Sequence, residues 1–282
     1  MKQSDIEAMI LLRNNTPLDI FSGLTPTEMH RLMYDTFGER SPIQFRPDIG
    51  DATLDKIPFF RLTEAFLKIV QREKKIKLTP AGALQRKVLY ELYDLRLMTS
   101  WYIEGGYLKV WNEEQWSEML SVRLTAGIAG LVRKSNGRIV INAKGTKLLK
   151  AENRVELFKV VFAAFSLEFN WGFNDYYADF PIGQLGFGYS IYLIDLFGDK
   201  LLPSKFYSSA YLTAFPDLMD QFADDAYMNA ERQFQNCYSL RTIERFLDWF
   251  GLVCIEGEGI GRFKEGFELM RSELFRQIFV IE

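Results

Sequence analysis

The feature that most constrains the fold is residues 120–150, where a helical pattern, two short strand patterns and a second helical pattern follow one another. Apolar residues at helical spacing end at Gly130, which suits the left-handed position just past a helix. Asn136 and Gly137 then separate two β-favouring segments, and this dipeptide is a strong signal for a two-residue hairpin turn. Asn142 is placed to cap the next helix. This order predicts a winged-helix unit.

A weaker copy of this pattern occurs near the end of the chain. A helical pattern over residues 243–250 is followed by Gly-Leu-Val at 251–253, which repeats Gly-Leu-Val at 130–132. A glycine-rich tip, a return strand within 262–270 and a helix capped by Ser272 complete the pattern. We therefore expect a second, degenerate winged-helix unit whose many acids make contact with nucleic acid unfavourable.

Helical patterns occupy most of the remaining chain. Thr25 with Glu28 three residues later predicts a capping box, and Thr79 before Pro80 predicts another helix start. The pair Gly105-Gly106 favours a short hairpin, and residues 151–172 carry an aromatic stripe at helical spacing. The predicted fold is mainly α with small antiparallel β-hairpins, a helical protein containing one clear and one degenerate winged-helix unit.

Charge is unevenly distributed along the sequence. The formal net charge of −3 is the sum of −2 over residues 1–70, +8 over 71–150 and −9 over 151–282. We expect residues 1–70 to form a helical N-terminal region, residues 71–150 a basic winged-helix-like domain, and residues 151–282 an acidic helical domain that ends in the second winged-helix-like unit. A basic segment between acidic flanks gives information about binding partners rather than about the fold.

Composition removes several classes of function. A single histidine (His30) and two cysteines (Cys237 and Cys254) cannot supply a His-rich or Cys-rich metal site, so no metal and no cofactor are expected. No apolar run approaches the roughly 18 residues of a membrane span, and the N-terminus lacks a secretory signal, so we expect a cytoplasmic protein with no membrane partner. The prediction is a protein without catalytic activity.

The basic segment suggests a nucleic-acid-binding site for double-stranded DNA. In a DNA-binding winged helix, the helix before the hairpin enters the major groove and cations of the hairpin meet phosphates. The predicted phosphate contacts are Arg133, Lys134, Arg138 and Lys144, and the predicted groove-facing residues are Ser121, Arg123 and Thr125.

Two alternatives stay open. The chain could instead be a protein–protein interaction or structural module, which predicts an exposed apolar patch and pairing with a protein partner or in a homodimer. It could also carry a hydrolase-like site, since Glu168, Asp175 and Asp179 lie among aromatic residues and glycosidases use paired carboxylates. That site requires the carboxylates to converge in an open cleft.

Residues 23–37 (GLTPTEMHRLMYDTF) and 77–93 (KLTPAGALQRKVLYELY) resemble an uncharacterised bacterial family. Some members of that family carry a SEC-C zinc motif or a plasmid ORF-3-like segment. The resemblance covers most of the chain and implies winged-helix parts, but no activity. This sequence lacks the Cys/His cluster of a SEC-C motif, so the resemblance implies no zinc site here.

Overall fold

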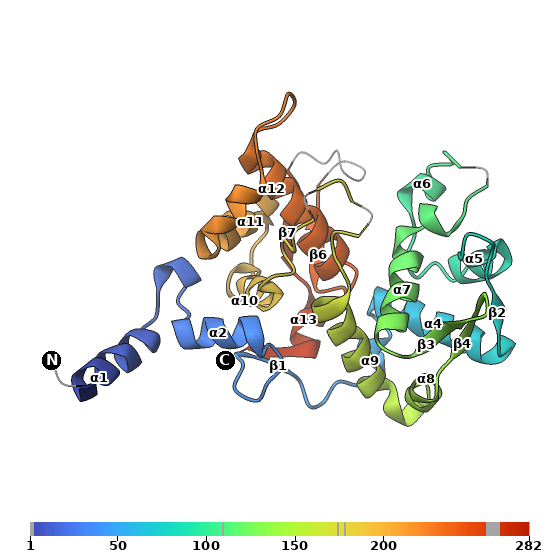
Figure 1. Cartoon of the computed structure of the whole chain (residues 1–282), viewed down its shortest axis with the longest axis horizontal. Coiled ribbons are helices and arrows are strands. Elements are labelled where there is room, and N and C mark those ends of the chain that lie inside the picture. The colour runs from blue at the N-terminus through green and yellow to red at the C-terminus, as the bar shows by residue number, and fades with distance from the viewer. Residues whose placement is uncertain (1–2, 109, 174, 178, 258–265, 282) are drawn as a thin grey trace. The chain divides into compact units, whose positions relative to one another are not determined.

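The computed structural model describes residues 3–108, 110–173, 175–177, 179–257 and 266–281 (Figure 1). It is mainly α with small antiparallel sheets, as the sequence predicts. Contacts divide the chain into two compact units. The middle unit is Asp48–Asn174 with Trp249–Gly251, and the flanking unit is Met1–Pro47, Asp175–Asp248 and Leu252–Glu282. The three-part division at residues 70 and 150 stays a prediction.

The middle unit contains helices around one small sheet. Its elements in chain order are α3 (Asp51–Leu54), α4 (Pro58–Glu73), β2 (Ile76–Lys77), α5 (Arg86–Tyr93), α6 (Trp101–Glu104), η2 (Glu113–Gln115), α7 (Ser117–Ile128), β3 (Val132–Ser135), β4 (Arg138–Ile141), α8 (Ala143–Leu148), η3 (Ala151–Asn153), α9 (Arg154–Ala163) and the π-helix η4 (Ala164–Glu168).

Aromatic side chains form the core of the middle unit. The ring of Phe165 packs on those of Phe59 and Phe250, at centroid distances of 4.9 and 5.3 Å. Phe162 meets Phe250 edge to face at 4.8 Å. The aromatic stripe predicted over residues 151–172 therefore faces the core through α9 and η4, where close aromatic pairs add to the free energy of burial.

The sheet of the middle unit has the order β2-β4-β3, with antiparallel pairing throughout. Asn136 and Gly137 both have positive φ, 48° and 67°, which confirms the predicted two-residue turn. Behind the hairpin, α8 approaches so closely that a Cβ on Gly145 would lie 2.3 Å from the carbonyl oxygen of Leu131. Only glycine fits there without a shift of the backbone.

Two local predictions in the middle unit are wrong. Thr79 and Pro80 belong to a turn rather than to a helix start, because the Thr79 hydroxyl accepts from the Ala83 amide and Gly82 takes a φ of +82°. Helix α5 begins six residues after Pro80. The expected hairpin at Gly105 is replaced by α6 and a turn, with an Ile103–Gly106 backbone bond.

The flanking unit also combines helices with small sheets. Its elements in chain order are α1 (Gln3–Asn14), η1 (Asp19–Phe21), α2 (Pro26–Tyr34), β1 (Ile43–Phe45), α10 (Phe187–Phe197), β5 (Leu202–Pro203), α11 (Ser204–Ala214), η5 (Pro216–Gln221), α12 (Ala230–Tyr238), the π-helix η6 (Ser239–Leu247), β6 (Val253–Glu256), β7 (Glu268–Arg271), α13 (Glu273–Ile278) and β8 (Phe279–Ile281).

The predicted caps of the flanking unit are present. Thr25 and Glu28 form the capping box of α2, and the Ser272 hydroxyl accepts from the Phe275 amide at the start of α13. Gly251, which ends the preceding helical segment and lies in the middle unit, has a φ of +67°. The predicted glycine-rich tip and the first part of the return strand fall on residues 258–265, which lie outside the described residues.

The strand order β5-β7-β6 matches the order β2-β4-β3 of the middle unit. In both cases a short strand, two or more helices and a hairpin follow a helix, and the last strand of the hairpin lies in the centre of the sheet. That the second sheet belongs to a degenerate copy of the first unit stays a prediction. The winged-helix assignment itself stays a prediction.

A buried ion pair stabilises the flanking unit. Both Arg241 and Asp175 have almost no exposed side-chain surface, 1% and 0%. The guanidinium donates to the two carboxylate oxygens at 2.7 and 3.0 Å and to the Phe180 carbonyl at 2.6 Å. Removing one partner of such a pair leaves the other charge buried and uncompensated, which is strongly destabilising.

We expect Arg241→Ala to lower the free energy of unfolding by about 3–5 kcal/mol, since the buried Asp175 carboxylate then loses its two short bonds and keeps the longer, 3.9 Å contact with Arg245. Urea unfolding followed by circular dichroism measures this. Arg276→Ala is the matched control, because its pair with Asp199 is two-thirds exposed on both sides and such pairs contribute about 0.2–1 kcal/mol. Equal losses for the two variants would contradict the assigned role of the buried pair.

The two cysteines should differ sharply in reactivity. Burial raises the pKa of the Cys237 thiol to about 12, whereas Cys254 is exposed. Because the thiolate is the reactive form, we expect the folded protein to show one fast thiol toward a disulfide reagent at mildly alkaline pH. Cys254→Ser should abolish that fast phase, and Cys237 should react only after unfolding. A fast phase retained in Cys254→Ser would contradict this prediction.

Candidate functional site

The hairpin of the middle unit presents three cations on one face of its sheet. Lys77 pairs with Arg138, and Arg138 with Ser135, so these residues project to the same side. Arg133 lies two residues before Ser135 and shares that side. All three cations are exposed. We call Lys77, Arg133 and Arg138 the basic sheet face.

The opposite side of the same sheet is buried. It carries Ile76, Ile139 and Val132, each at most 5% exposed. Lys134 also projects to this side, opposite Ile139. It stays exposed because β3 is an edge strand of the sheet. The apolar side therefore fixes which way the cations point, and of the predicted hairpin cations Arg133 and Arg138 belong to the basic sheet face.

Among the described residues, the side chains of the basic sheet face make no hydrogen bond or ion pair with another side chain. Carboxylates of the same unit pair with other arginines: Glu91 with Arg72, Glu104 with Arg96, and Glu113 with Arg123. Hydrogen bonds from Arg72 hold the pKa of Glu91 below its usual range. These ion pairs involve none of the three cations of the basic sheet face.

Lys144, a predicted phosphate contact, makes a hydrogen bond within the protein. Its Nζ donates to the Ala129 carbonyl at 2.9 Å, at the C-terminal end of α7. A cation there satisfies a helix-end carbonyl and interacts favourably with the helix dipole. Part of its donor capacity is thus used inside the protein, and it is not part of the basic sheet face.

The predicted groove-facing residues do not form a reading surface. Ser121 and Thr125 are 5% and 0% exposed, because this side of α7 is taken up by packing in the middle unit, where α7 meets α4 and η4. The exposed residues of α7 are Gly127 and Ile128, which offer no polar side chain to a base edge. The expectation that Ser121 and Thr125 face a groove is wrong.

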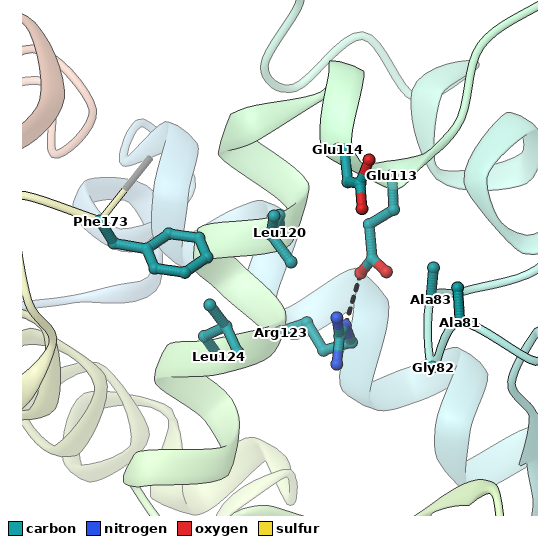
Figure 2. Close-up of a pocket in the computed structure, with 9 residues that line it drawn as sticks. All are labelled: Ala81, Gly82, Ala83, Glu113, Glu114, Leu120, Arg123, Leu124 and Phe173. Atoms are coloured by element: carbon teal, nitrogen blue, oxygen red, sulfur yellow. Dashed lines mark hydrogen bonds and ion pairs between the residues drawn. The ribbon is translucent and has the colours of Figure 1, made fainter. Parts of the chain in front are cut away.

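Arg123, the third predicted groove residue, lines a pocket instead (Figure 2). Its Nε donates to Glu113 at 2.5 Å, and the Leu84 amide donates to the other oxygen of Glu113 at 2.8 Å. The Glu113 side chain is 1% exposed. This carboxylate therefore joins α7 to the chain segment before α5.

The pocket has a volume of about 340 Å³ and combines apolar and charged walls. Leu120, Leu124 and Phe173 form the apolar part of the lining (Figure 2). Ala81, Gly82, Ala83 and the exposed Glu114 complete the lining. No sequence pattern predicted this pocket. The one local signal was Asn112 with Gln115, which form the capping box that positions Glu113.

The three carboxylates of the hydrolase alternative have different environments. The side chain of Asp175 is buried in its pair with Arg241, whereas Glu168 and Asp179 are exposed. A carboxylate bonded on both oxygens by an arginine is not available as an acid or base in an open cleft. This removes the observation on which the hydrolase alternative depends.

Other site classes receive no support from the described residues. His30 is exposed and its ring lies 4.8 Å from that of Tyr34. Within the described ranges, no group of three or more His, Cys, Asp or Glu side chains is arranged to hold a metal ion. In the same part of the chain, no helix is long and apolar enough to cross a membrane.

Residues 55–154 match the family model of the Y4jL N-terminal domain, a family without an assigned activity. The match covers most of the middle unit, including the basic sheet face and α7. No curated protein and no solved structure is significantly similar to the chain. The comparisons therefore support similarity to an uncharacterised family over this region. The SEC-C and ORF-3 relationships stay predictions.

We expect Glu113→Ala to destabilise the middle unit by about 3–5 kcal/mol, because it leaves Arg123 without its buried partner. Glu114→Ala is the matched control, since the neighbouring side chain is exposed and such changes stay within about 0.5 kcal/mol. Chemical denaturation measures both. A Glu113→Ala loss no larger than that of Glu114→Ala would show that the pair does not stabilise the fold.

Proposed function

We propose that this chain is a non-catalytic macromolecule-binding protein whose basic sheet face binds the phosphate backbone of double-stranded DNA. The observation that carries the proposal is the arrangement of Lys77, Arg133 and Arg138 on one exposed side of a small sheet. Lys and Arg side chains that neutralise phosphates release condensed counterions, and this release drives binding.

The proposed binding is largely independent of base sequence. Base readout needs polar side chains that can reach base edges in a groove. The exposed part of α7 offers Gly127 and Ile128, and Arg123 is engaged by Glu113. The cations of the basic sheet face can instead contact the phosphate backbone of the duplex. The shared strand order of the two units supports a winged-helix architecture for the protein.

A protein partner is the second candidate. An acidic protein surface would also be attracted by the basic sheet face, and winged-helix units serve in protein interfaces as well. Binding to DNA can be distinguished from binding to an acidic protein, because counterion release from the duplex makes the logarithm of the binding constant fall steeply and linearly with the logarithm of the salt concentration.

The salt dependence of binding to a random duplex tests the proposal. We expect Arg138→Ala to reduce the log–log slope by about 0.9, since one phosphate contact is lost, and the alanine triple variant of the basic sheet face to reduce it by about 2.7. Fluorescence anisotropy with a labelled duplex measures both slopes.

Lys56→Ala is the matched control. Lys56 is an exposed cation of the same unit that lies outside the hairpin, so its removal should leave the slope unchanged. Equal slopes for Arg138→Ala and Lys56→Ala would show that DNA is bound elsewhere. Absence of binding by the unmodified chain at low ionic strength would overturn the proposal itself.

A further inference from the structure

Helix α1 is an unusual element, because it has no buried residue along its whole length, Gln3–Asn14. The large apolar side chains in its middle are among the most exposed in the protein. Their exposed fractions are 60% for Met9, 53% for Ile10, 67% for Leu11 and 72% for Leu12. An isolated helix of about 12 residues is marginally stable in water, so α1 lacks the packing that normally maintains a helix.

The apolar residues of α1 are consecutive rather than confined to a stripe. Residues 8–12 are all apolar, and at 3.6 residues per turn five consecutive positions cover the full circumference of the helix. A helix that is apolar all round is ordinarily buried. The end of α1 is fixed to its own unit, since the Thr27 hydroxyl donates to the Asn14 carbonyl. The rest of α1 therefore requires a partner.

The charges of α1 favour a second copy of the same helix in antiparallel orientation. Asp5 lies in the first turn and Arg13 in the last. Each is four residues from Met9, which places both within about 40° of Met9 around the helix axis. When two copies pair antiparallel about Met9, Asp5 of each copy lies opposite Arg13 of the other. The pairing is thus complementary in charge at both ends and apolar in the middle.

A membrane surface fits α1 less well. Helices that lie in a membrane interface are typically rich in Lys and Arg on their polar face. Between Gln3 and Asn14 the helix carries Asp5 and Glu7 but a single base, Arg13. This balance is unfavourable near anionic lipids.

We propose that α1 is a self-association element, and that two copies of this chain dimerise through an antiparallel pair of α1 helices centred on Met9. The proposal is independent of the proposed DNA binding, which rests on the middle unit. It makes a specific claim about register, because Asp5 and Arg13 are paired between the two copies.

Sedimentation equilibrium of the full chain tests the dimer. We expect the unmodified chain to be a dimer, and the double variant Met9→Glu/Ile10→Glu to be a monomer that still unfolds cooperatively, with a Tm that no longer depends on protein concentration. Tyr227→Glu is the matched control, since Tyr227 is a 91% exposed aromatic residue of the same unit and should leave the dimer intact. A monomeric unmodified chain, or a dimer that survives the double variant, would overturn the proposal.

Charge reversal tests the register. Asp5→Arg alone and Arg13→Glu alone each place like charges opposite one another twice per dimer, so each should weaken dimerisation by about tenfold. A mixture of the two variants should recover the original affinity as heterodimers, since every pair is then of opposite sign. Failure of the mixture to recover affinity would contradict the antiparallel pairing, because loss of helix stability or docking of α1 within one chain is not repaired by mixing.

Vesicles provide the remaining discrimination. Co-sedimentation of the unmodified chain with vesicles of neutral and anionic phospholipid should show no binding that depends on Met9 and Ile10. Binding to vesicles that is lost in the double variant, together with a monomeric chain in solution, would assign α1 to a membrane surface instead.

Discussion

The register of the sheet β2-β4-β3 is the constraint on which the proposed function depends. Successive residues of a strand point to opposite sides, so a slip of one residue would exchange the buried and exposed sets. Ile76 and Ile139 pair on the buried side, and Lys77 and Arg138 pair on the exposed side. The turn at Asn136 and Gly137 fixes this register locally. The burial of a few aliphatic residues is therefore what orients the cations.

Electrostatic pairing elsewhere in the middle unit leaves those cations available. Arg72, Arg96 and Arg123 pair with the carboxylates of Glu91, Glu104 and Glu113. The Glu113 pair is nearly buried, and it ties α7 to the segment before α5. The same contact that stabilises this unit withdraws Arg123 from a surface role. The Glu113–Arg123 pair therefore affects both the stability of the middle unit and which of its cations can bind a partner.

Local sequence patterns predicted an element correctly where the backbone needs a conformation or a hydrogen bond that few residue types can supply. The turn at Asn136 and Gly137, the capping box of Thr25 and the Ser272 cap follow from conformations or hydrogen bonds that few residue types supply. Thr79-Pro80 misled because the same dipeptide suits a turn as well as a helix start. The turn is stabilised by the positive φ of Gly82 and by the hydrogen bond from the Ala83 amide to the Thr79 hydroxyl.

The candidate site was predictable only in part. Charge along the sequence identified Arg133 and Arg138, but Lys77 joins them through strand pairing across more than 60 residues, which no local pattern shows. Ser121 and Thr125 were misplaced because small polar residues are compatible with both a groove-facing and a core-facing side of a helix. Which side of α7 is buried is decided by its packing against α4 and η4.

Hydrogen exchange in the presence of a short DNA duplex tests the central claim most directly. If the basic sheet face binds the phosphate backbone, backbone amides of β2, β3 and β4 gain protection at low salt, and this protection is lost at high salt. The amides of the flanking unit stay unchanged. Protection confined to other segments, or no change in the hairpin while DNA is bound, would contradict the account.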